Sequence, residues 1–264
     1  MTCAYWRVPR YLSLEGYQAP RETASELHKP SIVMVAVLRA MQKQNLEVNV
    51  YHYNASITTC GNCGQWQLAL GLFVEMSNQR IEKDTITYNT TISASTRGAQ
   101  WQLALLMLSE MGQQEVKKDK FTYSAAITAC EKSGHWELAL VLFCEMTDRK
   151  IRKDEVTFNT TISACEKGGQ WQLALSLLDE MSKSKVWKDT VTYNASISAC
   201  EKSGQWQLAL ALLDAMDCAK LMRNTITYSA GISACEKGGK WELAIGLLRE
   251  MAENRISKDT IVFN

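Results

Sequence analysis

A column of small hydrogen-bonding side chains recurs through the sequence every 35 residues. Its members are amides and hydroxyls: Asn54, Asn89, Ser124, Asn159, Asn194 and Ser229. A second column lies 30 residues further on and contains only carboxylates and one amide: Asp84, Asp119, Asp154, Asp189, Asn224 and Asp259. Because an amide offers both a donor and an acceptor, the two columns together have the chemistry needed to read the edge of a nucleotide base.

Two further columns with the same spacing supply the other needs of a base-reading surface. The first is apolar, so that a base could stack on it: Tyr51, Ile86, Phe121, Val156, Val191 and Ile226. The second is basic and could meet a phosphate: Arg97, Lys132, Lys167, Lys202 and Lys237. Val191, Asn194 and Lys202 fall on one face of a helix, which we expect to line the inside of the array.

The elements that must position these columns follow from a tandem repeat. Trp66 recurs without slippage as far as Trp241, and Met76 recurs in the same phase as far as Met251. Within each repeat two apolar stripes of helical period are separated by a Gly-containing turn, which predicts a pair of helices. We expect Trp and Met to fill the seam between neighbouring repeats, with the tryptophans buried.

A single helical hairpin is too small to be stable, so the hairpins must stack. The sequence therefore predicts an all-α fold, a right-handed α-solenoid of 35-residue helix-turn-helix repeats. Six repeats occupy residues 50–259, a degenerate repeat residues 31–49, and a seventh, truncated repeat begins at 260–264. Residues 1–30 form an unstructured lead, a cap or a transit segment: the first 14 contain no Asp or Glu, as transit peptides do, but Ser is scarce.

The repeats resemble those of the pentatricopeptide repeat family. The resemblance rests on Thr-Val-Thr-Tyr-Asn-Ala-Ser-Ile-Ser-Ala-Cys from Thr190 and Ala-Leu-Ala-Leu-Leu-Asp-Ala-Met from Ala209, and it covers residues 50–259. A tetratricopeptide array has a 34-residue period and a different Trp, Leu-Gly and Tyr pattern. The chain departs from the family where Lys-Asp replaces the common Lys-Pro-Asp and where Trp replaces an aliphatic residue.

The resemblance implies sequence-specific binding of single-stranded RNA, one base per repeat, 5′ to 3′ along the array. Under the family's code, Asn with a terminal Asp favours U, Ser with Asp favours G, and Asn with Asn favours a pyrimidine. The implied site is 5′-UUGU(C/U)G-3′. The resemblance also implies a role in organellar RNA processing, stability or translation, in a chloroplast or mitochondrion, although a cytoplasmic location stays open.

Each column also has a purely structural interpretation. The Asn, Ser and terminal Asp side chains could cap helix one of each repeat. The lysines could belong to a solvated charge ladder, because a Glu precedes four of the five basic residues and residues 50–259 contain 23 Lys and Arg against 24 Asp and Glu. A helical scaffold that binds proteins is the alternative function, but such a scaffold should vary the polar columns more widely.

Nothing in the sequence points to catalysis. Cys60 and Cys63 have the spacing of a redox or zinc half-site, but Cys60 recurs in phase with the repeat and is better explained as a small buried residue. The chain has three histidines and no phosphate-binding loop or deaminase motif. We therefore expect no enzyme activity, no cofactor and no metal. With no apolar run approaching 20 residues, we also expect no membrane partner.

Overall fold

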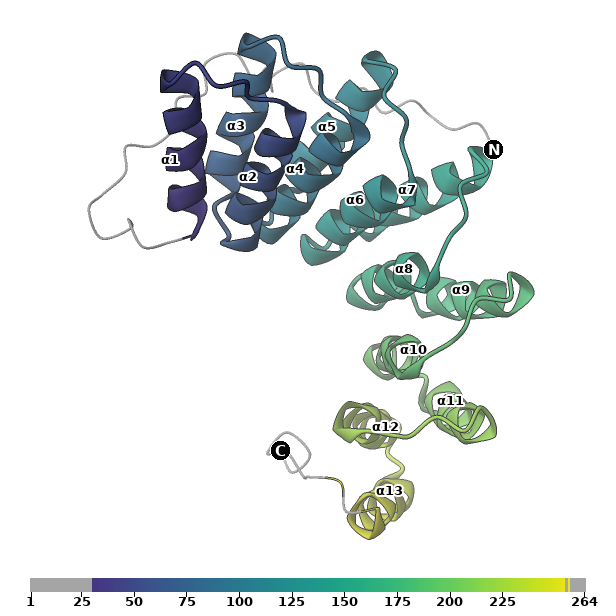
Figure 1. Ribbon diagram of the computed structural model, residues 1–264. Helices are drawn as coiled ribbons and strands as arrows, with labels where there is room; N and C mark the ends of the chain where they lie inside the picture. Colours follow the sequence, from purple (N-terminus) through teal and green to yellow (C-terminus); the bar gives the residue numbers. More distant parts are fainter. Residues whose placement is uncertain (1–29, 255, 257–264) are drawn as a thin grey trace. The chain divides into compact units, whose positions relative to one another are not determined.

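The computed structural model describes residues 30–254 and residue 256, and these residues form helices joined by short turns, with no strand among them (Figure 1). The predicted all-α helical-repeat fold is confirmed. Most of the predicted lead, the start of a seventh repeat and Asp259 lie outside the described residues. The helices are α1 Pro30–Lys43, α2 Val50–Asn62, α3 Trp66–Asn78, α4 Thr85–Arg97, α5 Trp101–Gln113, α6 Lys120–Lys132, α7 Trp136–Asp148, α8 Glu155–Lys167, α9 Trp171–Lys183, α10 Thr190–Lys202, α11 Trp206–Cys218, α12 Thr225–Lys237 and α13 Trp241–Glu253.

The chain divides into two compact units, Met1–Ser133 and Gly134–Asn264. In the first unit α2, α4 and α6 pack side by side, with α1 against α2, and α3 and α5 each pack against two of these helices. In the second unit α8, α10 and α12 form the equivalent row, and α9, α11 and α13 pack behind it. The first helix of each repeat therefore contributes to a continuous row within its unit, and the row carries the candidate columns.

The ends of the helices follow from local sequence. The residue before each first helix from α4 to α12 is Asp or Asn, and its side chain accepts a hydrogen bond from the backbone N–H of the third helical residue. Five of the six first helices are followed by a glycine in the left-handed region, as at Gly169 with φ +66°. The second helices from α3 to α11 are followed by a residue in the same left-handed conformation that is not glycine, as at Lys150 with φ 56°.

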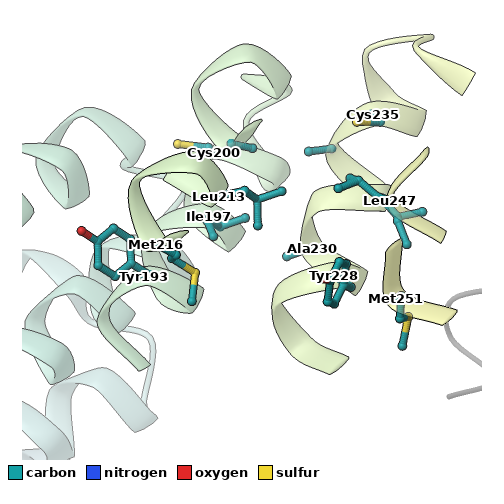
Figure 2. Packing of buried hydrophobic residues seen from close by; sticks show 13 residues of the cluster. Tyr193, Ile197, Cys200, Leu213, Met216, Tyr228, Ala230, Cys235, Leu247 and Met251 are labelled. Atoms are coloured by element: carbon teal, nitrogen blue, oxygen red, sulfur yellow. The ribbon is translucent and has the colours of Figure 1, made fainter. Parts of the chain in front are cut away.

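The core of each repeat is built from the apolar stripes of its two helices, as the sequence predicts. Tyr193, Ile197 and Cys200 of α10 pack with Leu213 and Met216 of α11 (Figure 2). Every methionine of the periodic series is fully buried: Met76, Met111, Met146, Met181, Met216 and Met251. The alanines that allow the two helices to approach are also fully buried from the first repeat to the fifth: Ala69, Ala104, Ala139, Ala174 and Ala209. The methionine part of the seam prediction is confirmed.

The tryptophans differ from the prediction. Five are half-buried, and Trp241 is 66% exposed. Each stands at the first position of a second helix, and the rings of Trp66, Trp136 and Trp206 lie against the turn of the following repeat. A Cβ on Gly98 would collide with the ring of Trp66, and one on Gly168 would collide with that of Trp136. The tryptophans therefore lie in the seam but stay open to solvent on one side.

Candidate nucleic-acid interface

The two polar columns form hydrogen-bonded pairs. We call the fifth residue of a first helix and the last residue of the same repeat the candidate reading pair. In the four described pairs that contain Asn and lie within one compact unit, the Asn Nδ2 donates to an oxygen of its partner. These pairs, with their N···O distances, are Asn54–Asp84 at 3.2 Å, Asn89–Asp119 at 3.1 Å, Asn159–Asp189 at 3.2 Å and Asn194–Asn224 at 3.2 Å.

The terminal residue of each pair is also a helix cap. Asp84 Oδ1 accepts from the backbone N–H of Thr87 at 2.8 Å, and the Thr87 hydroxyl accepts from the Asp84 backbone N–H to complete a capping box. The capping interpretation is thus correct for the terminal Asp. It does not hold for Asn54 and its equivalents, because these lie inside the helix, five residues beyond the cap.

The caps keep the terminal carboxylates ionised. Burial alone would raise the pKa of Asp119, but hydrogen bonds from the Thr122 backbone and hydroxyl and from the Asn89 amide outweigh it, and the pKa is lowered. The pKa values of Asp84 and Asp189 are lowered in the same way. An ionised carboxylate can only accept, so the atom of the neighbouring Asn that faces it must be Nδ2.

In two predicted pairs the first member is a serine, and for these the structure describes the members separately. Ser124 is the fifth residue of α6 in the first compact unit, whereas Asp154 caps α8 in the second, where it accepts from the Thr157 N–H at 3.1 Å. Ser229 is the fifth residue of α12, and its partner Asp259 lies outside the described residues. Each described serine therefore occupies the same helical position as the asparagines.

The apolar column is exposed. All six predicted stacking residues lie three positions before the reading Asn or Ser, and between 55% and 73% of each is open to solvent: Tyr51, Ile86, Phe121, Val156, Val191 and Ile226. Their neighbours Tyr53 and Ile57 in the same helix are fully buried. Packing does not account for six exposed apolar side chains at one position, so the column is available to a planar ligand.

The basic column ends the first helices, and the structure places it in an inter-repeat ladder. Lys202 Nζ lies 2.7 Å from Glu166 Oε1 of the preceding repeat, and Lys237 pairs with Glu201 at 2.5 Å. Arg97 donates to Asn62 Oδ1 at 2.7 Å. Lys132 and Lys167 end α6 and α8 at the same position. At Lys202 and Lys237 the acid of the preceding repeat meets the lysine, as the charge-ladder interpretation predicts.

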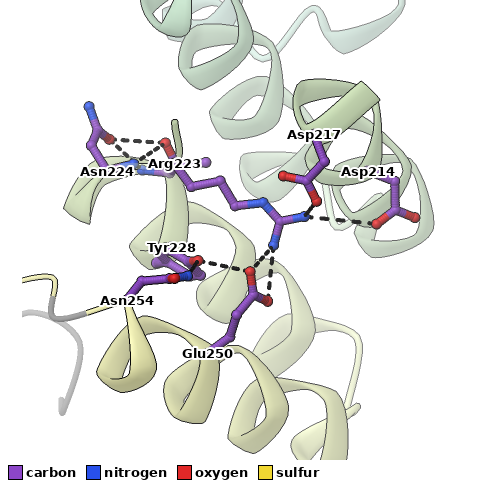
Figure 3. Close-up of polar contacts among 8 residues, drawn as sticks. Asp214, Asp217, Arg223, Asn224, Tyr228, Glu250 and Asn254 are labelled. Carbon is purple, nitrogen blue, oxygen red and sulfur yellow. Dashed lines mark hydrogen bonds and ion pairs between the residues drawn. The ribbon is translucent and has the colours of Figure 1, made fainter. Parts of the chain in front are cut away.

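A network that could not be predicted from the sequence holds the chain just before three of the terminal residues. Arg223 binds Glu250 at 2.8 Å and Asp217 at 2.6 Å, and the Tyr228 hydroxyl donates to the same Glu250 (Figure 3). Lys153 with Glu180, and Lys83 with Glu110, are the equivalent pairs. The available signal was the basic residue that precedes every terminal Asp or Asn.

The described residues contain no group of His, Cys, Asp and Glu side chains that could hold a metal ion. Cys60, Cys130, Cys165, Cys200 and Cys235 are buried, and Cys63 is exposed. Among the described helices none is both long and apolar enough to cross a bilayer.

The fold and the repeated pair define a helical-repeat protein with one polar module per repeat. Residues 118–167 and 188–237 match the PPR repeat family, residues 36–97 match the pentatricopeptide repeat domain, and residues 156–186 and 226–256 match the PPR repeat. The chain belongs to the pentatricopeptide repeat family. A search of curated proteins found no match.

Solved structures share the architecture. The pentatricopeptide repeat protein PPR10 from maize is 26% identical over 90% of this chain, with a TM-score of 0.69, and the chain covers 34% of PPR10. PPR10 in complex with an 18-nt psaJ RNA element is 23% identical over 88% of this chain and 39% of that one, with a TM-score of 0.55. The PPR domain of Arabidopsis thaliana protein-only RNase P 1 in complex with tRNA is 11% identical over 67% of this chain and 94% of that one, with a TM-score of 0.61. The chain thus spans about a third of the length of PPR10.

Proposed function

We propose that the chain binds single-stranded RNA sequence-specifically, one base per repeat, and that it acts as a binding module and not as an enzyme. The observation that carries the proposal is the recurrence, on the row of first helices within each unit, of an exposed apolar side chain beside an Asn hydrogen-bonded to a terminal Asp or Asn. A base stacked on Val191 would meet the Asn194 amide with its edge. The RNA-bound PPR10 and RNase P 1 structures support this proposal by analogy.

The proposed site is 5′-UUGU(C/U)G-3′, with the stacking residues and reading pairs named above and with phosphate contacts from the basic column. The binding event would serve RNA processing, stability or translation, and the family resemblance favours an organelle as its place. A scaffold for proteins is the competing function.

Fluorescence anisotropy at a stated salt concentration tests the proposal with labelled UUGUCG and a scrambled strand of the same composition. We expect tighter binding of the designed strand, because each well-made base contact contributes about 1–3 kcal/mol of discrimination by analogy with groove readout. Equal affinity for both strands would remove the code and leave the scaffold function.

The Ser124→Asn variant sharpens the test. It gives the third repeat the side chain found in the first, second, fourth and fifth repeats, so the preference at the third base should move from G towards U. Asn159→Ser is the matched reverse change and should move the fourth base from U towards G. A shift in stability without a shift in either preference would contradict base reading.

A further inference from the structure

The third residue of several first helices contacts the Asn of the preceding repeat. Thr122 Oγ1 donates to Asn89 Oδ1 at 2.7 Å, and Thr192 Oγ1 donates to Asn159 Oδ1 at 2.6 Å. Thr227 makes the same contact with Asn194 at 2.6 Å. These three threonines are fully buried, so they cannot themselves touch a ligand.

Each hydroxyl sits between the two members of a reading pair. Thr192 Oγ1 lies 2.8 Å from Asp189 Oδ1 and 2.6 Å from Asn159 Oδ1, and it accepts from the Asp189 backbone N–H at 3.2 Å. Since the hydroxyl carries one hydrogen, that hydrogen is shared between the carboxylate and the amide oxygen. The threonine thus joins the cap of one repeat to the amide of the repeat before it.

This arrangement fixes which way the amide faces. The Asn159 Nδ2 points to the Asp189 carboxylate and its Oδ1 to the Thr192 hydroxyl. Turning the amide over would place Oδ1 against an ionised carboxylate, which cannot donate, and would end the donation of the Thr192 hydroxyl to Oδ1, so the reversed orientation is disfavoured. One N–H and one lone pair of the amide then remain for a base, in a fixed order.

We propose that Thr122, Thr192 and Thr227 are positioning residues that set the base preference of the preceding repeat by holding its Asn amide in one orientation. The inference rests on the proposed function of the reading pairs and adds a third determinant to each of them. Base preference in this chain thus depends on the Asn, on the terminal Asp or Asn, and on a threonine of the next repeat.

The first repeat provides an internal contrast. Thr87 Oγ1 donates to Asp84 Oδ1 at 2.8 Å. The Asn54 Oδ1 is buried and accepts no hydrogen bond from any described residue. The Asn54 amide is therefore held at its nitrogen end alone, and the first base should be read less strictly than the second and the fourth.

The experiment compares Thr192→Val with Thr192→Ser on four RNAs that differ only at the fourth base. Valine keeps the shape of threonine but removes the hydroxyl, whereas serine keeps the hydroxyl. We expect wild type and Thr192→Ser to favour U by about tenfold, the scale of one good hydrogen-bonded contact. The preference of Thr192→Val should fall below about threefold. In a second set of four RNAs that differ only at the fifth base, read by Asn194, its preference should equal that of wild type.

The matched control is Thr157→Val. The Thr157 hydroxyl contacts the capping carboxylate Asp154 at 2.9 Å, as Thr192 does at Asp189, but Thr157 follows the repeat that carries Ser124. Its loss should lower stability as much as the loss of the Thr192 hydroxyl and leave the fourth base read normally. Thermal unfolding of all variants separates a weakened helix cap from a changed preference.

The outcomes distinguish the positioning role of Thr192 from the proposed RNA binding. A wild type that selects U while Thr192→Val selects it equally well would overturn the positioning role alone. A Thr192→Val variant that weakens all four RNAs by the same factor would do so as well, because it would make the threonine purely structural. A wild type without preference at the fourth base would overturn the proposed function and this inference together.

Discussion

The terminal residues Asp84, Asp119 and Asp189 each serve two helices at once. Asp119 accepts from the Asn89 amide in its own repeat and caps α6 in the next, where Thr122 donates to it from backbone and side chain. Its carboxylate is therefore held in place by the chain itself, without RNA. A group positioned in advance loses little freedom when it binds, which favours its use in recognition.

The ionised state of Asp119 leads to a pH prediction. Because its pKa is lowered in the folded chain, the carboxylate contributes stability that is complete above the ordinary Asp pKa of about 3.9 and is lost as the pH falls through the folded value. Asp119→Asn keeps a capping side chain, as Asn224 shows in α12. The variant should lose less stability between pH 6 and pH 3, by about 0.3–1 kcal/mol.

Urea unfolding at the two pH values measures this difference. Asp148→Asn, at the exposed end of α7, is the control and should follow wild type. An Asp119→Asn variant as acid-sensitive as wild type would show that the cap is equally strong when the carboxyl is protonated.

The half-buried tryptophans lead to a second prediction at this scale. Full burial of Trp171 would make Trp171→Ala cost about 3–5 kcal/mol. Since the ring is only half-buried, we expect about half of that, whereas Met181→Ala in the fully buried seam should cost about 2–5 kcal/mol. Urea unfolding ranks the two variants, and a larger loss for Trp171→Ala would mean that the ring contributes more than its exposure suggests.

Among the turns that join the two helices of a repeat, one lacks the glycine that its backbone conformation favours. Five of the six turns after first helices have glycine at the residue with positive φ, and the exception is Ala99 with φ 54°. A left-handed conformation costs a residue with a Cβ about 1–2 kcal/mol. The turn between α4 and α5 therefore carries backbone strain that the equivalent turns, which contain glycine, avoid.

Ala99→Gly should stabilise the chain by about 0.5–1 kcal/mol, the relief of strain less the extra freedom that glycine gives the unfolded chain. Gly169→Ala is the matched reverse change, because nothing lies near its added Cβ and only the backbone conformation opposes it. Paired thermal and urea unfolding of the two variants should give shifts of opposite sign. A destabilised Ala99→Gly would show that the turn is not strained.

The helices themselves could be predicted because their apolar residues recur at the right spacing. Phe158, Ile162 and Cys165 indicated α8, and the structure buries all three. The exposure of the tryptophans could not be predicted, because periodicity gives the phase of a residue but not its depth in the stack. The pairing of Lys153 with Glu180 and the role of Thr192 depend on contacts across repeats, which one repeat viewed alone does not reveal.

Over the whole chain the charge is balanced, so we expect the proposed attraction to a phosphate backbone to come from the ladder of basic and acidic side chains. Lys202→Ala should weaken binding of all RNA sequences alike and reduce the salt dependence by about one phosphate contact. Glu166→Gln should do the opposite, because it frees Lys202 from its partner. Anisotropy titrations over a range of salt concentrations measure both, and unchanged slopes would reduce the ladder to a structural role.

The cysteines give a test of the fold across both compact units. Burial raises the pKa of Cys130 to about 12 and that of Cys165 and Cys200 to about 11, and these thiols are shielded from solvent. Iodoacetamide at pH 8 should therefore label Cys63, Cys144 and Cys218 first, as peptide mass spectrometry would show. Rapid labelling of the buried thiols would contradict the packing. Protection of Cys63 from labelling would instead favour a redox or zinc site at Cys60 and Cys63.

Because Thr192 belongs to one repeat and contacts the Asn of the repeat before it, the residues that would read one base do not coincide with one 35-residue repeat. Recombination between repeats in register restores the contact wherever a repeat with Asn at the fifth position is joined to one with threonine at the third, as Asn159 and Thr192 are. An array of this kind can lengthen or shorten by recombination inside a helix without breaking a junction. An engineer who transplants the recognition of the fourth base would have to move residues 156–192, not residues 155–189.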